Sequence, residues 1–145
     1  MGIYHLIPQE SGDYCVCSVL QAVLNYHGDA ISQEEIAREV TPGCKGGFLI
    51  NDNLIKDFMS KRGYYYKYFS HNETPFNEPD FLLDQMSAYH GLVATNSHVR
   101  LLQDFIDPKL ILIDPADGSF VRADLGDVRR VMASLGGGFG LIKKL

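Results

Sequence analysis

The sequence predicts an α+β fold in which N-terminal helices pack on an antiparallel sheet. Apolar residues recur at helical spacing in the first half of the chain, whereas short β-prone runs follow one another in the second half. Helices and strands are therefore grouped along the chain, which is typical of α+β folds and not of alternating βαβ folds. With 145 residues, 46% of them hydrophobic, the chain can bury a full core, and we expect one domain covering residues 1–145.

The first predicted helix covers residues 13–26. Asp13 is the expected N-cap, and Gly28 stands where a helix would end. The apolar stripe of this helix consists of Val16, Val19, Leu20 and Val23. This spacing indicates a helix that buries one face in the core.

Two more helices are expected before the first strand. Ser32 and Glu35 have the spacing of a capping box, which opens the second helix. Residues 41–47 contain one proline and three glycines and are predicted to form a loop. The third helix is expected over residues 52–61 and ends before Gly63.

The second half of the chain has the pattern of a meander of strands. Strands are expected at residues 64–70, 91–95, 98–105, 109–113 and 139–143, and helices at residues 78–89 and 124–134. Asp107-Pro108 is a turn signal that would join the third and fourth of these strands into a hairpin. Residues 114–118 form the next predicted turn, and the glycines at 136–138 are interpreted as a flexible approach to the last strand.

Composition excludes several classes of function. The net charge of −5 and the scattered basic residues argue against a nucleic-acid partner. Three cysteines, an odd and low number, do not indicate a disulfide framework. The N-terminus does not resemble a signal peptide, and no apolar run approaches the roughly 20 residues that span a bilayer. We therefore expect a reducing, cytoplasmic location and no membrane segment in this chain.

Cys15 is the candidate nucleophile. It lies in the first turn of the first predicted helix, where unpaired backbone N–H groups and the helix dipole favour a thiolate and can stabilise an oxyanion. A lone helical cysteine is nevertheless more often a core residue. Cys17 lies about 200° further around the helix and is expected in the core. The Cys-x-Cys spacing is not that of a zinc site, so no metal and no cofactor are expected.

Three further residues complete the candidate site. Gln9 lies six residues before Cys15, and its amide can donate a hydrogen bond to an oxyanion. His98 begins a predicted strand, and Asp114 follows the strand with which it would form a hairpin, so these side chains are expected to be neighbours. A carboxylate–imidazole hydrogen bond would fix the imidazole tautomer and support its protonated form.

These motifs together resemble the bacteriocin-processing cysteine peptidase family. The relevant segments are QESGDYC at 9–15, YHG at 26–28, ISQEEI at 31–36, His98 at a strand start, and DPADG at 114–118. The family consists of papain-like domains, best known at the N-termini of ABC exporters, which cleave leader peptides after a double glycine. The resemblance covers roughly residues 5 to 143, and its specific part is the Gln–Cys and His–Asp spacing.

The resemblance implies a role for each of these side chains. Cys15 would attack an amide carbonyl, His98 would be its base, Asp114 would orient that base, and Gln9 would contribute to the oxyanion hole. The implied partners are a peptide or protein substrate and a transporter or other partner protein with which the chain would associate. One departure concerns the strand that His98 opens, because Arg100 stands where the family usually has an apolar residue.

Three functions are compatible with these residues. The first is a peptidase that cleaves a peptide or leader through an acyl-thioester. The second keeps the same triad for a different acyl group, as in a deamidase, a glutaminase or an acyl transferase. The third is a peptide-binding module without turnover, which the presence of all four side chains disfavours. The predicted function is the first, a cysteine peptidase.

Overall fold

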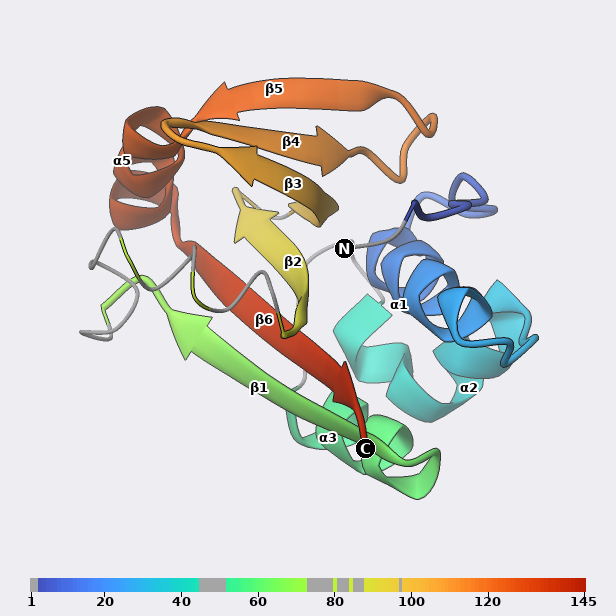
Figure 1. Ribbon diagram of the computed structural model, residues 1–145. Helices are drawn as coiled ribbons and strands as arrows, with labels where there is room; N and C mark the ends of the chain where they lie inside the picture. Colours follow the sequence, from blue (N-terminus) through green and yellow to red (C-terminus); the bar gives the residue numbers. More distant parts are fainter. Residues whose placement is uncertain (1–2, 45–51, 73–79, 81–83, 85–87, 97) are drawn as a thin grey trace.

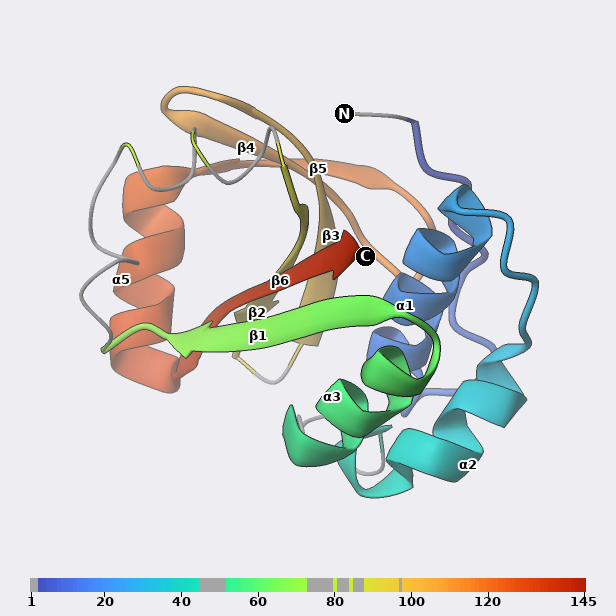
Figure 2. The same cartoon turned by 60° about the horizontal axis from the view of Figure 1, so that its bottom comes forward.

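The computed structural model describes residues 3–44, 52–72, 80, 84, 88–96 and 98–145. Its helices are α1 (Cys15–Tyr26), α2 (Gln33–Cys44), α3 (Asp52–Lys61) and α5 (Leu125–Leu135). Its strands are β1 (Tyr64–Ser70), β2 (His90–Thr95), β3 (His98–Ile106), β4 (Lys109–Ile113), β5 (Phe120–Asp124) and β6 (Gly137–Lys144). Helices α1 to α3 gather at one side of the sheet, and α5 lies on the other side (Figures 1 and 2).

The six strands form one sheet in the order β1-β6-β2-β3-β4-β5. Every neighbouring pair is antiparallel. The sequence-adjacent pairs β2/β3, β3/β4 and β4/β5 form the meander, whereas β6 returns from the end of the chain to lie between β1 and β2 (Figure 1). The α+β arrangement predicted from the sequence is confirmed.

Two buried clusters cover the two faces of the sheet. Alternate residues of β2 and β3 separate between them: Ala94 and Leu101 belong to the cluster under α1 to α3, whereas Val93 and Leu102 belong to the cluster under α5. This is the period-two pattern of a strand buried on both sides. Each large apolar side chain that is fully buried contributes about 1.5–3 kcal/mol, so both faces hold the helices in place.

Most predicted elements are present with small changes at their ends. The bounds predicted for α3, β1 and β4 match the structure, and the turn at Asp107-Pro108 joins β3 to β4. Ser32 Oγ accepts a hydrogen bond from the Glu35 N–H at 3.1 Å, as the capping box requires. Gly28 follows the end of α1 with a φ of 84°, a conformation that glycine adopts without strain. The helix predicted over residues 78–89 lies mostly outside the described residues.

Two predictions about helix ends and loops are wrong. Helix α1 begins at Cys15, its N-cap is Tyr14, and no side chain caps it, so Asp13 is not the cap. Helix α2 continues to Cys44 through residues predicted to form a loop. A non-helical Val40 kinks this helix, and Pro42 follows in the first turn of the second piece, where proline is tolerated.

The end of the chain differs from the prediction in two places. Strand β5 was not predicted, because Arg122 and Asp124 interrupt its apolar pattern, but it pairs along β4. Strand β6 begins at Gly137, and its glycines are tightly packed instead of flexible. A Cβ at Gly137 would lie 2.0 Å from the Ala94 carbonyl oxygen, and one at Gly138 would lie 2.1 Å from the Phe69 carbonyl oxygen. Glycine is therefore needed there for the close approach of neighbouring strands.

A partly buried pair of imidazoles joins the end of α1 to the start of β2. Nε2 of His27 lies 2.7 Å from Nε2 of His90, and Nδ1 of His90 lies 2.5 Å from the Tyr4 hydroxyl. Burial and the neighbouring His27 imidazole lower the pKa of His90 to about 4. Burial and the Lys144 ammonium also lower the pKa of His27, against the opposing effect of Asp29. Both imidazoles are therefore neutral in the folded protein at pH 7.

This pair should make the free energy of unfolding depend on pH between about 6.5 and 4. An imidazole with a lowered pKa in the folded state stabilises the fold above its unfolded pKa, and this stability is lost as the pH falls. We expect wild-type protein to lose about 3 kcal/mol over this range from His90 alone. In His90→Gln, urea unfolding at a series of pH values should show a much smaller fall in the free energy of unfolding over this pH range.

The matched control is His5→Gln, which removes an exposed imidazole next to Tyr4 in the sequence. This variant should keep the wild-type pH dependence. An unchanged pH dependence in His90→Gln would show that the imidazole pair does not control stability in acid.

Candidate active site

The structure brings His98 and Asp114 together at one end of the β3/β4 hairpin. Leu101 pairs with Ile113 in the antiparallel register, so the start of β3 lies beside the residue that follows β4. Nε2 of His98 lies 2.7 Å from Oδ1 of Asp114. Both side chains are partly exposed, His98 at 26% and Asp114 at 15%. The pair therefore forms where the sheet ends and solvent can reach it.

The Asp114 carboxylate accepts three N–H groups. Oδ1 accepts from His98 Nε2 and, at 2.9 Å, from the Ala116 backbone N–H, whereas Oδ2 accepts from Arg100 Nε at 3.1 Å. Burial raises the pKa of Asp114, but these hydrogen bonds and the charges of His98 and Arg100 outweigh burial, and the pKa is lowered. Asp114 is thus ionised at pH 7 and can only accept, so Nε2 of His98 carries the hydrogen.

Cys15 is the first residue of α1 and is almost fully buried, at 3% exposure. Figures 1 and 2 show that α1 starts beside the end of the sheet where β3 begins. Cys15 belongs to the same buried cluster as Val99, the residue after His98, and α1 packs against β3. Cys17 lies in the same cluster, two residues past the start of α1, and is fully buried. Cys15 is therefore the cysteine that occupies the first position of the helix.

Gln9 lies in the segment that precedes α1, and its backbone ties this segment to the Asp114 turn. The Gln9 backbone N–H donates to the Pro115 carbonyl oxygen at 2.7 Å. The side-chain Nε2 donates to the carbonyl oxygens of Ser11 and Gly12 at 3.0 and 3.1 Å. The side-chain Oε1 is buried and accepts no hydrogen bond within the described part of the chain. In this structure the Gln9 amide therefore donates to its own loop.

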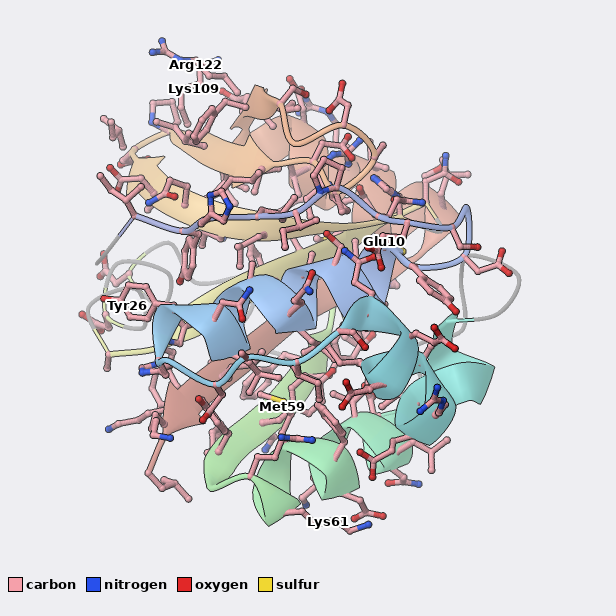
Figure 3. All side chains as sticks on the ribbon, turned by 90° about the vertical axis from the view of Figure 1, so that its right-hand side faces the viewer. Glu10, Tyr26, Met59, Lys61, Lys109 and Arg122 are labelled. Atoms are coloured by element: carbon pink, nitrogen blue, oxygen red, sulfur yellow. The ribbon has the colours of Figure 1, made fainter. Side chains whose placement is uncertain are left out.

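A buried glutamine holds the same segment against α1 and α2. Gln33 is fully buried, and its Nε2 lies 3.1 Å from the carbonyl oxygens of Ile7 and Pro8 and 3.0 Å from Gln21 Oε1. Its Oε1 accepts the Glu10 backbone N–H at 2.9 Å. Figure 3 shows Glu10 at the start of α1 and Tyr26 at its other end. Gln33 therefore fixes the segment that leads to Cys15.

Sequence reasoning missed the polar side chains that support this segment. Gln33 follows Ser32 in the capping motif and reads as a surface residue at a helix start. Ser18 is a buried residue of α1 outside its apolar stripe, and its Oγ donates to the Ile7 carbonyl oxygen at 2.6 Å. Most of their partners are backbone groups distant in sequence, which no local pattern indicates. Arg100 was visible as a charge in an apolar strand, but its contact with Asp114 was not predicted.

The described residues contain no group of three side chains that could hold a metal ion. None of the helices described is both long and apolar enough to cross a lipid bilayer.

Comparisons with known proteins find similarity in structure only. No protein-family model matches the sequence, and no curated protein sequence matches it. One similar structure is a double glycine motif protease from an AMS/PCAT transporter, solved with its leader peptide. It has a TM-score of 0.73 and 19% identity, over 99% of this chain and 93% of that chain.

A second similar structure is the peptidase domain of Streptococcus ComA, a bi-functional ABC transporter of a quorum-sensing pathway. Its TM-score is 0.69 and its identity 17%, over 99% of this chain and 100% of that chain. The chain therefore has the fold of these peptidase domains, and the predicted papain-like α+β fold is confirmed.

Replacing Gln33 by leucine should destabilise the protein by about 3 kcal/mol. The substitution removes the partner of the Glu10 N–H, the Pro8 carbonyl oxygen and Gln21 Oε1, whereas the Ile7 carbonyl oxygen keeps its bond from Ser18. Each buried group left unsatisfied costs about 1–3 kcal/mol. Urea unfolding measures the change. Glu39→Leu, on the exposed face of the same helix, is the control and should stay within about 0.5 kcal/mol of wild type. Equal effects in both variants would contradict this role for Gln33.

Proposed function

We propose that the protein is a thiol-dependent peptidase that cleaves an amide bond of a peptide or leader peptide. The observation that carries the proposal is the His98–Asp114 hydrogen bond of 2.7 Å at the end of the sheet beside which α1 and Cys15 begin. The similar structures support the choice of substrate, because one is a double glycine motif protease bound to a leader peptide and the other is a transporter peptidase domain.

The first chemical step is attack by the Cys15 sulfur. Asp114 holds the Nε2–H of His98, so Nδ1 is the ring nitrogen that accepts the thiol proton. The thiolate then attacks the carbonyl carbon of the scissile amide, and a C–S bond forms while the carbonyl π electrons move to oxygen. The positive end of the α1 dipole stabilises the thiolate before attack and the oxyanion after it.

The second step expels the amine and leaves an acyl-thioester. The C–N bond breaks as the protonated His98 gives its proton to the leaving nitrogen, and the carbonyl re-forms. A water molecule, deprotonated by His98, then attacks the thioester and returns Cys15 to the thiol state through a second oxyanion. Asp114 remains ionised throughout and supports the positive charge on His98 in each step.

The role proposed for Gln9 requires a change in its side chain. Its Nε2 now donates to the Ser11 and Gly12 carbonyl oxygens, so one of these bonds must be exchanged for a bond to the oxyanion. The buried Oε1 without a partner lowers the cost of this change, because the present arrangement does not satisfy the whole amide. The Cys15 backbone N–H would be the other donor of the hole.

The neighbouring structures also support proposals about organisation. Because the similarity extends over 99% of this chain and at least 93% of each peptidase domain, we propose a single domain. By analogy with the transporters that carry those domains, association with a transporter or another partner protein is proposed.

The first test is selective alkylation of Cys15. We expect iodoacetamide to label Cys15 at least 10-fold faster than free cysteine at pH 7, because the thiolate is stabilised by His98 and the helix start. His98→Ala should lower the labelling rate of Cys15 by about 100-fold, and peptide mass spectrometry assigns the label. Cys17 is the internal control, since it is fully buried. If Cys15 is labelled no faster than free cysteine, the proposed mechanism is wrong.

The second test is cleavage of peptides that contain a double glycine. We expect a new N-terminus directly after the glycine pair, detected by liquid chromatography and mass spectrometry, and no product with Cys15→Ala. Replacing the glycine pair by two leucines is the substrate control and should abolish cleavage. Release of ammonia from glutamine or asparagine side chains without chain cleavage would instead indicate a deamidase that uses the same side chains.

A further inference from the structure

Arg100 is a charged residue in the strand that carries His98. It lies two residues after His98 in β3, so both side chains project from the same face of the strand. Its Nε donates to Asp114 Oδ2 at 3.1 Å, and its Nη1 donates to Thr95 Oγ1 at 3.3 Å. The Arg100 side chain is 27% exposed and is therefore partly removed from water. It is held at two points, one of them the carboxylate that contacts His98.

The two oxygens of Asp114 have separate tasks. Oδ1 accepts from His98 and Ala116, and Oδ2 accepts from Arg100. A carboxylate bound only through Oδ1 can rotate about its Cβ–Cγ bond, and rotation moves Oδ1 out of the imidazole plane. The bond to Arg100 opposes this rotation, because turning the carboxylate breaks a charge-assisted hydrogen bond. The Thr95 contact in turn restricts the guanidinium.

We propose that Arg100 is a positioning residue that holds the Asp114 carboxylate in the orientation in which Oδ1 meets His98. The proposal rests on the proposed function, since it assigns Arg100 to the same triad. The positive charge of Arg100 stabilises the Cys15 thiolate and destabilises the protonated His98, so its two charge effects oppose each other. Its main effect is on orientation, and its loss lowers the reactivity of Cys15.

A different role for Arg100 must be separated from this one. Arg100 also lines a pocket of about 220 Å³ together with apolar side chains of β4, β5 and α5, and a substrate group there would contact the guanidinium directly. If Arg100 contacts substrate directly, its replacement would raise KM and leave the reactivity of Cys15 in the free enzyme unchanged. A positioning role changes the reactivity of Cys15 when no substrate is present.

The experiment measures the rate of Cys15 alkylation without substrate in Arg100→Leu and Arg100→Lys. We expect Arg100→Leu to lower the rate by about 10-fold and Arg100→Lys to restore it to within about 3-fold of wild type, because lysine can still reach the carboxylate. Arg122→Leu is the matched control, since it is an exposed arginine on β5, and Figure 3 shows it far from α1. It should label at the wild-type rate.

A double-mutant cycle with Asp114→Asn shows whether Arg100 acts through the carboxylate. If it does, Arg100→Leu lowers the labelling rate about 10-fold in the wild-type background and by less than about 2-fold beside Asp114→Asn. An equal loss in both backgrounds would overturn the proposal, and so would a wild-type rate in Arg100→Leu. Thermal unfolding of each variant shows whether a change in labelling rate comes from unfolded protein. If Arg100→Leu does not fold, the labelling rate of folded Arg100→Lys tests the proposal.

The two proposals fail in different ways. If wild-type Cys15 labels no faster than free cysteine, the proposed peptidase mechanism fails. If Cys15 labels rapidly and this depends on His98, but Arg100→Leu changes only the KM for a peptide substrate, the mechanism stands and the positioning role is wrong.

Discussion

The segment before α1 connects the helical layer to the sheet, and the candidate site depends on that connection. Gln33 holds its backbone from the helical side, through Ile7, Pro8 and Glu10. The Gln9 N–H holds it from the sheet side, at the carbonyl of Pro115, directly after Asp114. Because Cys15 comes from a helix and the His98–Asp114 pair from a hairpin, their relative position has to be set by contacts between layers. A buried amide with several partners suits this task, since its loss removes several hydrogen bonds at once.

The part of the site that lies within one hairpin could be predicted from the sequence. A turn at Asp107-Pro108 between two β-prone runs predicts the hairpin, and the hairpin brings the start of β3 close to the end of β4. A bulge between Leu102 and Asp104 shifts the register by one residue, and no pattern in the sequence indicates it. The Gln33 contacts could not be predicted in the same way. They join a helix start to backbone carbonyls more than twenty residues earlier, and a carbonyl has no sequence signal. Strand β5 was missed for a related reason, because pairing with β4 overrides its weak apolar pattern.

The similarity to peptidase domains at 17–19% identity shows how few positions this fold constrains. Apolar side chains can exchange when volume and pattern are kept, whereas the close strand approach at Gly137 and Gly138 leaves no room for a side chain. Arg100 illustrates the opposite freedom. It introduces a charge into a buried strand, and the charge is tolerated because Asp114 and Thr95 supply its partners. A new polar residue at such a position changes the site without changing the fold.

The two ends of α1 respond differently to acid, which follows from the groups that lie there. At the C-terminal end, the His27–His90 pair is stable while both rings are neutral, so its contribution is lost as the pH falls from about 6.5 to about 4. At the N-terminal end, the hydrogen bonds of Asp114 lower its pKa below the ordinary value, so its contribution is lost only below about pH 4. Mild acid therefore weakens the contact between α1 and β2 first, while the carboxylate beside His98 keeps its charge. The candidate site thus lies near the N-terminal end of α1, and the neutral His27–His90 pair packs at the opposite end.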